Sequence, residues 1–178
     1  DAEGVADALV GAWGRRSDIL VMNRPAPQDL PVDRLAMHAA LFDTDRPVLA
    51  VPDGHVAPFG ARIAIAWRPD KRTQRAVLSA LRLVPRGRPV HVLAGVKAGA
   101  AAPVLPDMLA EHGIAAELHA LPIGSAPFGE TLLAKAREIG ADLLGMGAYT
   151  HSAWREMMLG GVTRYVLAHA SLPVLLRH

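Results

Sequence analysis

Apolar residues along the chain follow two spacings, a period of two that predicts strands and a period near 3.6 that predicts helices. "ARIAIAW" (61–67) has the alternation and β-branched content of a strand, and apolar residues at 76, 77, 80, 81 and 84 form one helical stripe. From residue 61 onward we expect strands at 61–67, 88–96, 114–122, 141–147 and 173–177, separated by helices at 73–84, 102–113, 128–140 and 160–170. This alternation is typical of βαβ units in an α/β fold with an open, doubly wound parallel sheet.

The first 52 residues repeat the last part of this pattern. "SDILVMN" (17–23) is similar to "ADLLGMG" (141–147), and "RPVLAVP" (46–52) is similar to "LPVLLRH" (172–178). A helix is expected at 33–43 between the two strands, and another at 1–14 that buries Val5, Leu9 and Ala12.

This repeat defines a domain organisation. We interpret residues 1–52 as the C-terminal part of a first domain whose first three strands are missing, 53–60 as a linker rich in Gly and Pro, and 61–178 as a complete second domain. The alternative is a small extension of independent origin that merely resembles a half-domain.

Composition narrows the function classes. The chain is 51% hydrophobic and 20% charged, which is typical of a globular protein, and we find no apolar run long enough to span a membrane. The net charge is only +2 and the arginines are scattered among few aromatics, so we expect no nucleic-acid partner. The absence of cysteine excludes disulfides and thiolate metal ligands but does not decide the compartment. We expect a cytoplasmic protein.

A candidate ligand crevice follows from the expected topology. With strand order 3-2-1-4-5, ligands bind beyond the C-terminal ends of the first and fourth strands. Arg68 and Asp70 follow the first strand, and Gly147 and Thr150 follow the fourth. The helix that begins at Gly160–Gly161 directs free amide groups at the same crevice, which favours an anion such as phosphate.

The succession of strand, glycine, polar loop, glycine pair, helix and "PVL" ending in residues 140–178 resembles the universal stress protein family. The resemblance implies an adenine nucleotide alpha hydrolase-like fold. Nucleotide-binding members carry Gly, two residues, Gly, nine residues, Gly, and then Ser or Thr. Gly147 and Gly160 fit this motif, but Thr150 replaces its second glycine and Gly161 its hydroxyl residue.

A further departure lies at the first strand. The resemblance implies an acidic residue near adenine directly after this strand, where the sequence has Arg68, with Asp70 two residues on. We therefore expect a non-catalytic stress-response protein that binds or signals, with a degraded nucleotide-binding loop, no catalytic residues and no cofactor. The alternative is an ATP-binding switch or slow ATPase that uses the Gly147–Gly161 loop.

The resemblance also implies how the halves assemble. The two fifth strands, 47–52 and 173–178, are expected to pair in antiparallel fashion and to mediate self-association, and a further partner protein of unknown identity is expected. This pairing would leave the strand at 18–22 as an apolar edge.

The eight histidines give no metal motif in the sequence. None forms a His-x3-His pair on a helix, and we expect none to lie beside a suitable carboxylate cluster, so no metal site is predicted. His91 and His119 lie in predicted strands and are expected to face the sheet surface.

Overall fold

The computed structural model describes residues 5–24, 31–82, 89–148 and 161–178. In chain order the elements are α1 (Ala6–Gly14), β1 (Leu20–Asn23), α2 (Pro31–Phe42), β2 (Val48–Val51), β3 (Ile63–Trp67), α3 (Lys71–Leu81), β4 (Val90–Val96), α4 (Asp107–Glu111), β5 (Ala116–Pro122), α5 (Phe128–Glu138), β6 (Leu143–Gly147), α6 (Gly161–His169) and β7 (Val174–Arg177). Each predicted helix and strand is present among the described residues, although the helix predicted at 102–113 is shortened to α4. The predicted helix positions 1–4, 83–84 and 160 and strand position 88 lie outside the described residues.

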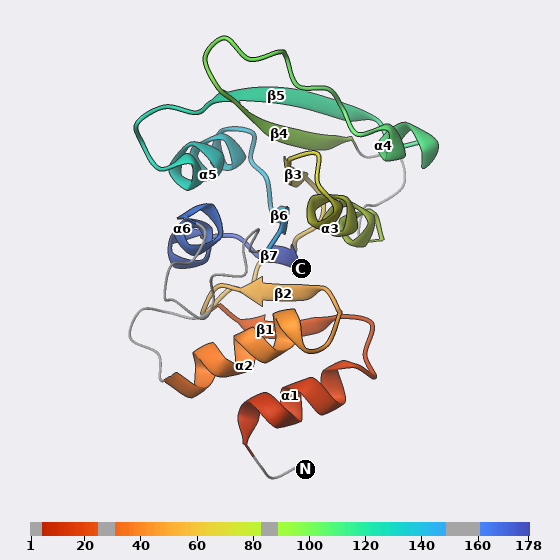
Figure 1. Cartoon of the computed structure of the whole chain (residues 1–178), viewed down its shortest axis with the longest axis vertical. Helices are drawn as coiled ribbons and strands as arrows, with labels where there is room; N and C mark the ends of the chain where they lie inside the picture. The colour runs from red at the N-terminus through yellow and green to blue at the C-terminus, as the bar shows by residue number, and fades with distance from the viewer. Residues whose placement is uncertain (1–4, 25–30, 83–88, 149–160) are drawn as a thin grey trace.

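The strands form one seven-stranded sheet in the order β1-β2-β7-β6-β3-β4-β5. Strands β3 to β7 keep the predicted 3-2-1-4-5 order, and the full sheet differs from it in continuing through β2 to β1 (Figure 1). Neighbouring strands are parallel except at the junction of β2 and β7, where Val48 lies opposite Leu176 in an antiparallel pair. The predicted α/β fold and the pairing of the two fifth strands are therefore confirmed.

Helices cover both faces of this sheet, as expected for a doubly wound fold. Residues of α2, α5 and α6 pack in one apolar cluster with buried residues of the sheet, including Leu144 and Leu176. Residues of α3 and α4 pack in a second cluster on the other face, around Ile65 and Val92. The predicted stripe of α3 is confirmed at Ala76, Val77 and Ala80, which are fully buried, whereas residue 84 lies outside the described residues.

The predicted inward face of α1 is wrong. Val5 is 68% exposed and Ala12 is exposed, whereas Gly11 and Gly14 are buried. A Cβ on Gly14 would lie 2.6 Å from Cγ2 of Thr44 and 2.9 Å from Cδ2 of Leu20, so the helix approaches its neighbours through its glycines. An apolar stripe could not identify this face, because close backbone approach selects the smallest residue.

The segment between β2 and β3, which contains the predicted linker 53–60, has no helix or strand. Its end is held by Asp142, whose carboxylate accepts hydrogen bonds from the backbone N–H groups of Gly60 (2.9 Å), Ala61 (2.9 Å) and Arg62 (3.0 Å). Asp142 directly precedes β6, so these bonds fix the start of β3 against the start of β6. The interpretation of residues 1–52 as part of a first domain stays a prediction.

The edge of the sheet at β1 is apolar, as predicted. Val21 is 64% exposed there, and β1 has a described partner only in β2. Among the described residues, no helix has both the length and the apolar character that a membrane crossing requires.

Candidate functional site

A cavity of about 440 Å³ lies at the C-terminal ends of β3 and β6, where the sequence predicted a ligand crevice. Its walls are mostly apolar and come from β3, α3, β4, β6, α5, α6 and the loops that follow the strands. The described lining residues are Ala66, Trp67, Arg68, Thr73, Leu93, Gly95, Ile123, Phe128, Leu132, Met146, Gly147, Gly161, Val162 and Thr163. A cavity of this size and composition suits one small organic ligand.

Arg68 and Asp70 are bound to each other at the rim of the cavity. Nε and Nη2 of Arg68 each lie 2.5 Å from Oδ2 of Asp70. The other carboxylate oxygen of Asp70 caps α3, because it accepts the N–H of Thr73 at 2.9 Å and its hydroxyl at 3.1 Å. Both oxygens of Asp70 are therefore occupied, and Asp70 is not among the residues that line the cavity.

These partners also set the charge state of Asp70. Burial acts to raise the pKa of its carboxyl group, but the hydrogen bonds from Thr73 and the bond and positive charge of Arg68 outweigh it, so the pKa is lowered. Asp70 is thus an anion at neutral pH that neutralises Arg68. This pairing reduces the positive charge that Arg68 offers to a phosphate.

The first turn of α6 supplies the side of the cavity suited to an anion. Gly161, Val162 and Thr163 line it, and an added Cβ at Gly161 would meet no atom of the described residues within 4 Å, which favours close approach of a ligand to its backbone. Gly147 lines the cavity from the end of β6. The structure therefore brings together Gly147, Gly161 and Arg68, whereas Thr150 and Gly160 lie outside the described residues.

Sequence reasoning missed Thr163. This residue is buried at the start of α6, two positions after Gly161, and it is one of the polar residues that line the cavity. The motif places the phosphate-binding hydroxyl at position 161, so a comparison by spacing alone passes over Thr163. The available signal was the position of Thr163 in the first turn of α6, because all residues of the first turn lie near the helix N-terminus.

Sequence reasoning also missed how Phe128 closes the cavity. A Cβ on Gly95 would lie 2.8 Å from Cζ of Phe128 and 3.0 Å from Cδ1 of Ile123. The glycine at the end of β4 therefore gives the Phe128 ring its place against the strand. No local pattern showed this contact, because it joins residues 95 and 128 across two elements.

Two histidines share one carboxylate, a grouping that the sequence analysis did not predict. His91 on β4 lies opposite Glu117 on β5, and His119 follows on the same face of β5. The three side chains form a group with metal-ligating atoms within 4.8 Å of one another. The pattern Glu-Leu-His in a predicted strand was a signal for the pair on β5, but His91 joins it only through the strand register.

These features define an α/β protein with a doubly wound sheet and a cavity at the point where strand order reverses. Residues 123–178, which include α5, β6, α6 and β7, match the Universal stress protein family. This match bears out the predicted resemblance to that family over the C-terminal segment. No curated protein matches the sequence.

Solved structures extend the likeness of fold to nearly the whole chain. A universal stress protein from Archaeoglobus fulgidus DSM 4304 matches with a TM-score of 0.72 and 20% identity over 96% of this chain and 64% of that one. A functionally unknown protein from Pseudomonas aeruginosa PAO1 matches with a TM-score of 0.65 and 13% identity, over 99% of this chain and 68% of that one. A putative universal stress protein from Pseudomonas aeruginosa UCBPP-PA14 matches with a TM-score of 0.65 and 14% identity, over 99% and 69%. The chain thus spans about two thirds of the length of each.

Proposed function

We propose that this protein is a non-catalytic stress-response protein of the universal stress protein type, which acts by binding and signalling. The observation that carries this proposal is the chemistry of the cavity. Its described lining residues include no His, Asp, Glu, Lys, Cys or Tyr, so the described wall has no group that exchanges a proton near neutral pH. The remaining polar groups there, on Arg68, Thr73 and Thr163, bind and orient a ligand but do not act as a general base.

A degraded nucleotide site is consistent with this role. The carboxylate of Asp70 is already occupied by Arg68 and Thr73, so it does not offer a free acceptor for an adenine amino group. Gly161 contributes no side-chain hydroxyl, and a hydrogen bond to a charged partner is worth about 1.5–3 kcal/mol. On this proposal the cavity binds ATP weakly at most.

A second candidate function, an ATP-binding switch, rests on a separate observation. The cavity combines apolar walls at Trp67 and Phe128, suited to a planar base, with the open N-terminus of α6 at Gly161. Thr163 adds a polar residue to the cavity wall on the same turn.

One titration distinguishes the two. ATP with Mg²⁺ is titrated into the protein by calorimetry, beside release of inorganic phosphate over hours. The variant Gly161→Asp places a negative charge at the α6 N-terminus, and a Cβ there meets none of the described residues within 4 Å. Ala110→Asp is the matched control, since Ala110 is exposed on α4, no residue of which lines the cavity.

Each outcome assigns the function. No binding up to millimolar ATP and no phosphate release would support a binding protein that works without nucleotide. Micromolar binding that Gly161→Asp abolishes and Ala110→Asp retains would replace it with the ATP-binding switch. Phosphate release above background, lost in Gly161→Asp, would refute the non-catalytic role.

Assembly stays a prediction. Strands β2 and β7 pair with each other within the chain, and each has a second neighbour, β1 and β6 respectively. Self-association through residues 47–52 and 173–178 would thus require an exchange of these strands between copies. The partner protein and the cytoplasmic location also stay predictions.

A further inference from the structure

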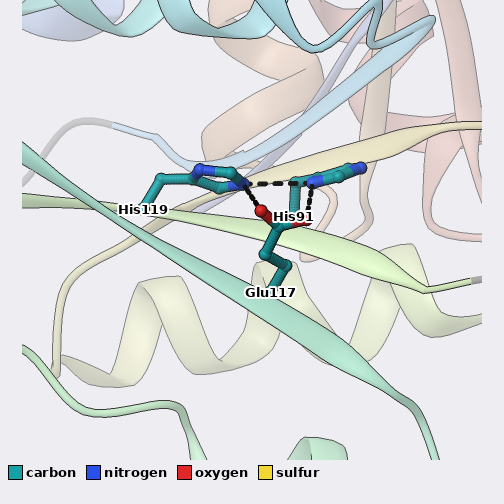
Figure 2. Close-up of side chains that lie close together, drawn as sticks. All are labelled: His91, Glu117 and His119. Atoms are coloured by element: carbon teal, nitrogen blue, oxygen red, sulfur yellow. Dashed lines mark hydrogen bonds and ion pairs between the residues drawn. The ribbon is translucent and has the colours of Figure 1, made fainter.

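Three side chains on the edge of the sheet converge in a way that the stress-response role does not explain. They are His91 on β4 and Glu117 and His119 on β5, and they form what we name the β4–β5 cluster (Figure 2). His91 and Glu117 are register partners in the parallel pairing of β4 with β5. His119 follows Glu117 by two residues, so its side chain emerges on the same face of the sheet.

The distances within the cluster are nearly equal. Nδ1 of His91 lies 3.1 Å from Nε2 of His119 and 3.4 Å from Oε2 of Glu117, and Nε2 of His119 lies 3.6 Å from Oε1 of Glu117. Donor atoms bound tetrahedrally to Zn²⁺ at 2.0–2.1 Å lie about 3.3 Å from one another. The dashed lines in Figure 2 join the two ring nitrogens to each other and each of them to one oxygen of the Glu117 carboxylate.

Hydrogen bonds join these groups only in part. One proton on an inward ring nitrogen bonds the two imidazoles to each other across 3.1 Å, and the exposed Glu117 carboxylate is then left to solvent. If both carry protons, each can donate to Glu117, but two N–H groups then face each other across 3.1 Å. A cation at the centre interacts favourably with all three groups at once.

Burial also favours a built site with one open side. The His91 and His119 side chains are only 14% and 11% exposed, whereas Glu117 is 64% exposed. The rings are therefore held by the sheet and its packing, and the cluster is reached from solvent on the carboxylate side. A rigid strand pair fixes ligand directions better than a loop does.

Two nearby cationic side chains limit the affinity of the cluster for a bound cation. Arg62 and Lys135 both lie close enough to His91 to oppose a further positive charge. Both are engaged elsewhere, because Nη1 of Arg62 donates to the carbonyl of Ile139 at 2.9 Å and Nζ of Lys135 donates to Glu138 at 2.6 Å. The pairing of Lys135 with Glu138 offsets its charge, and the Glu117 carboxylate contributes a negative charge at the cluster itself.

We propose that the β4–β5 cluster is a binding site for a divalent first-row transition metal ion, held by Nδ1 of His91, Nε2 of His119 and the carboxylate of Glu117. Two imidazoles and one carboxylate select ions such as Zn²⁺ over Mg²⁺ and Ca²⁺, which prefer oxygen ligands. Three protein ligands leave a coordination position for water or for a donor from a partner.

The test uses Zn²⁺ as the probe and the full chain as the protein. Zn²⁺ is titrated against a chromophoric chelator, with Glu117→Gln and His119→Phe as test variants. Glu117→Gln keeps the shape of an exposed side chain, so it preserves the fold, and circular dichroism verifies this for both variants. His112→Gln and His169→Gln are the matched controls, because both residues are exposed histidines outside the cluster.

We expect one Zn²⁺ per chain, bound at least about tenfold more weakly in Glu117→Gln and about a hundredfold more weakly in His119→Phe. Both controls should bind as the original protein does. Co²⁺ in place of Zn²⁺ should give the visible absorption of a four-coordinate site, and Glu117→Gln should diminish it. Equal affinity in all five proteins, or no Zn²⁺ binding at micromolar concentration, would overturn the proposal.

Discussion

The Asp142 carboxylate should be one of the strongest single contributors to stability outside the apolar core. Its two oxygens accept three backbone N–H groups, with Gly60 and Arg62 on Oδ1 and Ala61 on Oδ2. The substitution Asp142→Asn keeps the size of the side chain but removes its charge. If the amide oxygen keeps the bonds to Gly60 and Arg62, the amide NH₂ group then faces the N–H of Ala61, and that bond is lost.

The magnitude follows from the three bonds. A bond to a charged group contributes about 1.5–3 kcal/mol and a neutral one about 0.5–1.5, so each of the two retained bonds loses about 1 kcal/mol. The bond from Ala61 is lost outright. Because two of the three bonds are exposed to solvent, we expect a total loss of about 2 kcal/mol from the free energy of unfolding.

Urea denaturation, followed by far-ultraviolet circular dichroism, measures this loss. A loss of this size corresponds to a fall of about 6 °C in the melting temperature of a chain of this length. Asp53→Asn is the control, because Asp53 is an exposed aspartate of the segment between β2 and β3. If Asp142→Asn lost less than about 0.5 kcal/mol, or no more than Asp53→Asn, the three bonds would not hold the start of β3.

Two further substitutions test other contacts. Gly129→Ala should destabilise the fold by about 1–2 kcal/mol, because the new Cβ would lie 2.7 Å from Cβ of Tyr165. This cost of overpacking exceeds the gain in helix propensity. In the control Gly124→Ala, the new Cβ meets no atom of the described residues within 4 Å, so the denaturation midpoint should change little. Asp70→Asn should remove a pH-dependent part of stability: the pKa of Asp70 is lowered from 3.8, so its anion stabilises the fold above that pH, and the contribution disappears as pH falls towards the folded-state pKa. The stability curves of Asp70→Asn and the original protein should therefore converge in acid, and parallel curves from pH 7 to pH 2 would show that the bonds of Thr73 and Arg68 to Asp70 do not contribute.

The sequence predicted the fold well because its signals are local or repeated. Apolar alternation located the strands, and the similarity of "PVLAVP" to "PVLLRH" led to the antiparallel β2–β7 pair. The inward face of α1 was not predicted, because Gly14 is buried for its small size. A pattern of apolar positions does not show where a small residue allows close packing.

The candidate sites depended on contacts that no local pattern contains. The crevice at Gly147 and Gly161 was found, since strand order and helix direction fix its place. Thr163 was passed over because the motif defines position 161. The β4–β5 cluster required the register of two strands, which places His91 opposite Glu117 although they are 26 positions apart.

The antiparallel β2–β7 pair has a consequence for how the molecule comes apart. Val48 and Ala50 on one side of this joint and Val174 and Leu176 on the other are fully buried, and all four belong to the same apolar cluster as α5 and α6. Peeling β1, β2 and their helices away would expose the β7 side of that cluster to water, at a cost that grows with apolar area. The boundary between the two repeated parts of the sequence is therefore not a place where the folded protein separates. The two parts should melt together in one cooperative transition.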